Sequence, residues 1–173
     1  MTKIAPATIR FSAPRKRGLY AVFALLWLSG LMWLVFHYFL RVNGEFGEMN
    51  HPLQVWWLRL HGLAVFAALP ALGSVLSTHA QRAWKLKKNR TTGLFVKAIF
   101  LWLGLTGYAL YYFADEDNAA WLPVLHWAVG LSVPLMLALH IRHGRARSVR
   151  ASQHVQLNAA KPHTKQNKPK KAA

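Results

Sequence analysis

The chain has 173 residues, of which 54% are apolar, and it carries a formal net charge of +17. A soluble domain of this size does not combine so much charge with apolar runs of about 20 residues or more, whereas a membrane protein with basic loops does. The cations lie in loops and tails between these runs, which indicates an integral membrane protein and excludes nucleic acid as a partner. The absence of cysteine excludes disulfides, thiolate-bound metal clusters and covalently attached haem.

Four apolar runs predict four membrane-spanning helices, at residues 18–40, 53–80, 92–113 and 119–141. The first run is too long for a signal-peptide core and follows a basic tail, residues 1–17. Together the runs define an all-α transmembrane domain over residues 18–142. The polar, basic residues 143–173 cannot bury a core, and we expect a disordered tail there.

The distribution of lysine and arginine predicts the orientation. Five lie in the N-terminal tail, five in the loop after the second helix and nine in the C-terminal tail, whereas the other two loops contain only Arg41. Because cytoplasmic loops carry the excess of basic residues, both termini are predicted to be cytoplasmic. The expected fold is an up-down-up-down four-helix bundle in contact with membrane lipid, in a bacterial-type inner membrane.

Histidines mark both ends of the second and fourth predicted helices. His61 and His79 are eighteen residues apart, which is five whole helical turns, so both imidazoles should leave one side of the helix about 27 Å apart. His126 and His140 are fourteen residues apart, just under four turns. These helices run in the same direction in the predicted topology. The first histidine of each therefore lies near the outer surface and the second near the inner surface.

Two imidazoles that face each other from different helices are the ligand set of six-coordinate haem iron. Ionisable side chains inside a membrane normally face the bundle interior and have a partner. The pairing therefore predicts two non-covalent haems of b type. The outer haem would have His61 and His126 as axial ligands. The inner haem would have His79 and His140.

Other polar residues near these pairs have two interpretations each. His143 is the alternative ligand to His140, because it matches the axial depth, although it lies about 100° around the helix. His37 is a further candidate ligand or a hydrogen-bond partner of a propionate or a quinone, and packing alone is its simpler interpretation. Arg59, Arg82 and Arg142 are candidates to pair with haem propionates, or else they extend to the membrane surface.

Residues 18–142 resemble the four-helix di-haem b-type cytochromes, a group that includes cytochrome b561-like proteins and the cytochrome b subunits of membrane-bound hydrogenases and formate dehydrogenases. The resemblance rests on the four spans, the RLHG motif at residues 59–62 and the HW…LALHIR arrangement at residues 126–142. It implies electron transfer across the membrane between a quinone pool and a redox partner such as a cytochrome c or a dehydrogenase subunit. The loops are too short for a catalytic domain. The chain is therefore expected to be an electron-transfer subunit of an oxidoreductase complex.

Two other classes of function stay open at this point. A transporter or transition-metal protein could use the same histidines, but the predicted spans contain no acidic residue to help bind a metal ion or relay protons. A cofactor-free membrane assembly factor would leave the pairing of four histidines as a coincidence. The third predicted helix has no histidine, and its Gly104 and Gly107 indicate a role in helix packing.

Overall fold

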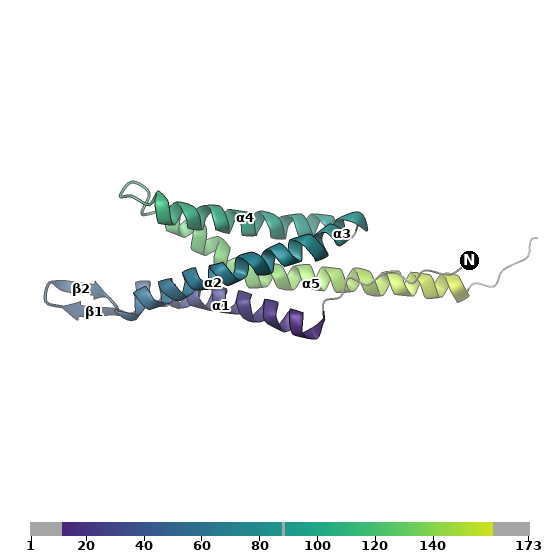
Figure 1. Cartoon of the computed structure of the whole chain (residues 1–173), viewed down its shortest axis with the longest axis horizontal. Helices are drawn as coiled ribbons and strands as arrows, with labels where there is room; N and C mark the ends of the chain where they lie inside the picture. Colours follow the sequence, from purple (N-terminus) through teal and green to yellow (C-terminus); the bar gives the residue numbers. More distant parts are fainter. Residues whose placement is uncertain (1–11, 88, 161–173) are drawn as a thin grey trace, which may run out of the picture.

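The computed structural model describes residues 12–87 and 89–160. Its elements are α1 (Ala13–Tyr38), β1 (Arg41–Gly44), β2 (Gly47–Asn50), α2 (Leu53–Val75), the π-helical turn η1 (Leu76–Ala80), α3 (Gln81–Lys85), α4 (Arg90–Tyr112) and α5 (Leu122–Ala160) (Figure 1). Four stretches are long and apolar enough to cross a membrane, namely Ala13–Tyr38, Leu53–Lys85, Arg90–Tyr112 and Leu122–Arg147. Within the described residues, the prediction of four helices long and apolar enough to cross a membrane is confirmed.

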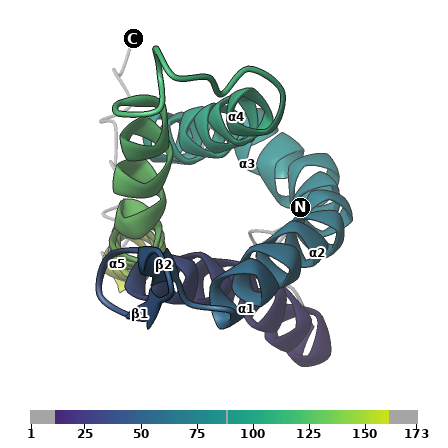
Figure 2. The same ribbon diagram turned by 90° about the vertical axis from the view of Figure 1, so that its left-hand side faces the viewer.

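The helices form two closely packed pairs. Helix α1 packs along α2, α4 packs along α5, and α1 touches α5 over a shorter stretch. Viewed along the long axis, α2 and α5 lie on opposite sides of the bundle, with α1 and α4 between them (Figure 2). The β-hairpin and the α4–α5 loop lie at one end of the molecule, and α3 lies toward the other (Figure 1). The two histidine-bearing helices therefore face each other across the bundle.

Few side chains are buried between the helices. The buried residues among those described are Ser29, Phe36, Ala64, Ala68, Thr106, Leu122 and Val133. Large apolar side chains along the helices are exposed instead, as Phe66 and Leu101 illustrate at 76% and 64% exposure. A water-soluble chain does not present so much contiguous apolar surface. The helices thus have the surface of a multi-pass membrane protein.

A short antiparallel hairpin forms the connection after the first span, where no strand was predicted. Strands β1 and β2 pair Arg41 with Asn50 and Gly44 with Gly47, so that two residues form the turn. Gly47 has φ +112°, a conformation that glycine adopts without a steric penalty. Phe46 at the tip is 97% exposed. Each strand has only four residues, which is too short for an alternation of apolar and polar residues to be recognised in the sequence.

Helix α5 is much longer than predicted. It continues through residues 143–160, where the sequence analysis expected disorder, and residues 161–173 lie outside the described part. A segment that is too polar to bury a core can still form a helix. Residues 145–160 are rich in Ala and Arg, which favour helix, and contain neither Gly nor Pro. Helix α1 likewise starts earlier than predicted, at Ala13, with Pro14 in its first turn.

The second span contains a π turn that the sequence analysis missed. Residues Leu76–Ala80 form η1, in which hydrogen bonds run from residue i to i+5. Just before it, the Ser74 carbonyl accepts hydrogen bonds from Thr78 Oγ1 at 2.6 Å and from Arg15 Nη2 at 3.0 Å. A π turn takes more residues than an α-turn. The count of five whole α-helical turns between His61 and His79 therefore does not hold.

Candidate functional site

The structure brings His61 of α2 and His126 of α5 together in the middle of the bundle. Their ring centroids are 6.4 Å apart, and the ring planes are nearly perpendicular at 86°. Two imidazoles bound to opposite sides of one metal ion have ring centres roughly 6 Å apart, because each metal–nitrogen bond is about 2 Å long. The separation of this pair therefore matches that of two axial ligands.

Helix α1 determines the orientation of the His61 ring. His61 Nδ1 lies 3.0 Å from the Leu26 carbonyl oxygen and 3.1 Å from Ser29 Oγ. A carbonyl oxygen only accepts hydrogen bonds, so Nδ1 carries the proton and donates it. Ser29 Oγ donates its own proton to the same carbonyl at 2.9 Å. In this tautomer His61 Nε2 has a bare lone pair, which is the form of histidine that binds metals.

Helix α4 holds the His126 ring in the same way. His126 Nδ1 lies 2.9 Å from Thr106 Oγ1, and that hydroxyl donates its proton to the Trp102 carbonyl at 2.8 Å. The hydroxyl then accepts from His126 Nδ1, which leaves Nε2 of this ring bare as well. The Trp102 indole also donates to the Leu125 carbonyl at 3.1 Å and ties α4 to α5 beside the histidine.

Two glycines make room for these rings. A Cβ added at Gly30 would lie 3.0 Å from Cε1 of His61, and one added at Gly107 would lie 3.3 Å from Cε1 of His126. A Cβ at Gly104 would meet nothing within 4 Å. Gly107 thus has the close-approach role that the sequence suggested for both glycines of the third span, and it approaches an imidazole.

Fewer contacts orient the inner pair, His79 and His140, than the outer pair. His140 Nδ1 lies 3.2 Å from Thr92 Oγ1 of α4, so the same helix contacts both predicted ligands of α5, His126 and His140. His79 belongs to the π turn η1 and is half-buried. His79 and His143 both lie within electrostatic reach of His140. The pairing of His79 with His140 stays a prediction.

The two alternative ligands lie outside the His61–His126 pair. His37 stacks on Trp33 with centroids 4.7 Å apart, and its Nδ1 lies 3.1 Å from Gln54 Nε2, so it belongs to a separate aromatic cluster at the hairpin end. His143 is exposed, and its Nδ1 lies 3.2 Å from the carbonyl of Leu139 on its own helix. Neither ring joins the His61–His126 pair.

The three arginines proposed for propionates are all exposed. The Arg59 guanidinium lies 4.8 Å from the centroid of the Trp56 ring, where it is held by a cation–π contact. Arg82 lies in α3 and Arg142 in α5. Their role toward propionates stays a prediction. Arg15, which the sequence analysis placed in the basic tail, is the cation that reaches the π turn beside His79.

The sequence analysis missed the residues that hold the imidazoles, although a signal was present. Ser29 and Gly30 in the first span and Thr106 and Gly107 in the third repeat one dipeptide pattern, a small hydroxyl residue followed by glycine. At Ser29–Gly30 and Thr106–Gly107 the hydroxyl contacts Nδ1 of a histidine on another helix, while the glycine provides space for its ring. Thr92–Gly93 in α4 is a third instance, in which the threonine contacts His140 but the glycine approaches no ring.

Each predicted pair consists of two imidazoles. Among residues 12–87 and 89–160, no group of three or more His, Cys, Asp or Glu side chains could hold a metal ion. The His61–His126 pair, with bare Nε2 atoms, fits a haem, whose porphyrin would supply the other four ligands. Comparison with protein-family models, with curated proteins and with solved structures gave no match.

Proposed function

We propose that this chain is a di-haem b-type cytochrome that transfers electrons across a membrane. The observation that carries the proposal is the His61–His126 pair, with its 6.4 Å centroid separation and with each Nδ1 hydrogen-bonded to a neighbouring helix. His61 and His126 would hold the outer haem. His79 and His140 would hold the inner one. When bound, each haem iron accepts and releases one electron.

The residues around the pairs perform the protein's part of this function. Leu26, Ser29 and Thr106 fix the rings and keep both protons on Nδ1, so that Nε2 is always available as a ligand. The exposed apolar side chains of the four spans would contact lipid and keep water away from the histidines. Two filled axial positions disfavour the binding of oxygen or substrate at iron.

The remaining parts of the proposal concern setting and partners. The bundle would run up-down-up-down in a bacterial-type inner membrane, with both termini cytoplasmic, as the lysine and arginine distribution predicts. A quinone pool and a partner redox protein, either a cytochrome c or a dehydrogenase subunit, would exchange electrons with the two haems. The chain would then be an electron-transfer subunit and not a self-contained enzyme.

An absorption spectrum of the purified chain tests the function. We expect a reduced-minus-oxidised spectrum with the low-spin signature of bis-histidine haem and a haem content of two per chain. Purification from cells supplied with haem precursor ensures that the cofactor is not limiting. A chain that folds into membranes but contains no haem under these conditions would contradict the proposal and favour a transporter or an assembly factor.

The Thr106→Val variant tests how the outer site is built. Valine keeps the shape of threonine but cannot accept the Nδ1 proton of His126. We expect the affinity for the outer haem to fall about 10- to 100-fold, because partners behind a ligating histidine have effects of this size. Titration of the haem-depleted chain with haem, followed by absorbance, measures it. Thr91→Val, at an exposed position of the same helix, should leave the affinity unchanged, and Thr106→Ser should restore it.

A further inference from the structure

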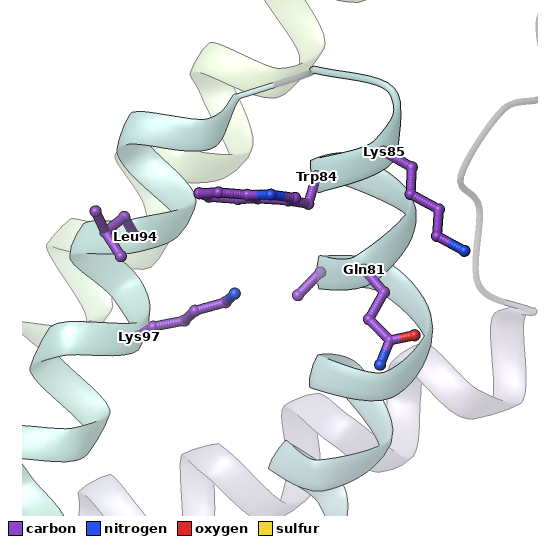
Figure 3. Close-up of a pocket in the computed structure, with 6 residues that line it drawn as sticks. Gln81, Trp84, Lys85, Leu94 and Lys97 are labelled. Carbon is purple, nitrogen blue, oxygen red and sulfur yellow. The ribbon is translucent and has the colours of Figure 1, made fainter.

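A cavity of about 380 Å³ lies at the opposite end of the molecule from the hairpin, between α3 and the first turns of α4. It is lined by Ala80, Gln81, Trp84, Lys85, Leu94 and Lys97. None of these residues belongs to the histidine pairs or to the groups that orient them. The Trp84 ring lies across the space between the two helices, and the Lys97 side chain extends from α4 toward α3 beneath it (Figure 3).

Cations gather around the Trp84 ring. Lys97 Nζ lies 5.6 Å and Arg90 Cζ 4.8 Å from its centroid. Arg90 also donates two hydrogen bonds to the Trp84 carbonyl, at 2.8 and 3.2 Å, which fixes the short connection between α3 and α4. Lys85 also lines the cavity, but its side chain extends from α3 away from Lys97 (Figure 3). Trp84, Arg90 and Lys97 therefore form a positively charged cluster.

The protein provides no nearby acidic residue to neutralise these charges. All five acidic residues lie at positions 45, 48 and 115–117, in the hairpin and in the α4–α5 loop. Both of these segments lie at the other end of the bundle (Figure 1). Lys97 is seven residues, or roughly 10 Å, inside α4, where an unneutralised ammonium is costly in a membrane. An anion from outside the protein would remove this cost.

The cavity is lined by both apolar and hydrogen-bonding side chains, as the binding of an amphipathic anion requires. Leu94, Ala80 and the Trp84 indole are apolar, while Lys85, Lys97 and Gln81 offer hydrogen-bond donors. Tryptophan is typical of the membrane–water interface, and basic pockets between spanning helices bind anionic lipid head groups. We propose that this cavity binds the phosphate head group of an anionic phospholipid, with Lys97, which extends into the space beneath Trp84, as its charged partner (Figure 3). This inference does not rest on the proposed haem function.

Lipid retention by the purified full-length chain tests the proposal. We expect native mass spectrometry to show one phosphatidylglycerol retained per chain, in preference to phosphatidylcholine at equal concentration. Lys97→Gln should weaken this binding about tenfold, as the loss of a hydrogen bond to a charged group does. Lys87→Gln, which removes the same charge from the nearby α3–α4 connection outside the cavity, should change it less than twofold.

The controls separate a built site from general attraction. Equal weakening by Lys97→Gln and Lys87→Gln, or equal retention of the two lipids, would overturn the proposal. Lys97→Arg should retain binding, and a loss of binding in this variant as well would also count against it. Inorganic phosphate at millimolar concentration should not displace the lipid, since it lacks the apolar part, and displacement would indicate a site for soluble phosphate. Haem content is recorded for each variant, so the failure of either proposal is visible independently of the other.

Discussion

Replacing either His61 or His126 by alanine is expected to remove one haem per chain, and it should be the same haem in both variants. The two rings lie 6.4 Å apart and would bind one iron from opposite sides, so the loss of either ligand opens the site. Haem content should fall from two to one per chain. A redox titration followed by absorbance should lose the same one of two transitions in both variants.

The inner pair supplies the matching half of this experiment. His79→Ala and His140→Ala should each remove the transition that survives in the outer-pair variants. His51→Ala, outside the spans, should leave both haems in place and serves as the control. Added imidazole should fill the space left by the missing side chain and restore a low-spin spectrum, which shows that a variant is folded. If the four variants do not divide into these two groups, the proposed pairing is wrong.

Gly30→Ala is expected to have the second largest effect, through a single added methyl group. Its Cβ would lie 3.0 Å from Cε1 and 3.1 Å from Nδ1 of His61. The ring cannot move aside easily, because its Nδ1 is hydrogen-bonded to Leu26 and Ser29. Displacement of a ligating atom from its productive position weakens a metal site severely. We expect at least about a tenfold loss of affinity for the outer haem, comparable with the loss of a supporting hydrogen bond.

A graded glycine series provides the control. Gly107→Ala should have a smaller effect, because its Cβ would meet Cε1 of His126 at 3.3 Å, while Gly104→Ala would meet nothing within 4 Å. The last variant should leave haem binding unchanged and stabilise α4 by up to about 1 kcal/mol, since alanine favours helix over glycine. Haem titration and thermal unfolding measure the two effects. Equal haem affinity across the series would contradict the packing of the rings against Gly30 and Gly107.

The sequence by itself determined the four spans and the placement of two histidines on each of two helices. Hydropathy and the 3.6-residue period are properties of short segments, so they can be read without the fold. Hydropathy and the 3.6-residue period did not predict two other features of the helices. Helix propensity continues α5 through residues 143–160 without any core to bury, and the π turn at Leu76–Ala80 changes the helical phase before His79.

Only the tertiary structure decided which groups hold the imidazoles. Ser29 is 32 residues from His61, Thr106 is 20 from His126, and Thr92 is 48 from His140, so each contact depends on how separate helices pack. The same is true of Gly30 and Gly107, whose value lies in the ring that each approaches. Spacing along one helix determines the side from which a histidine projects. The packing of helices distant in sequence determines its tautomer, its orientation and its partner.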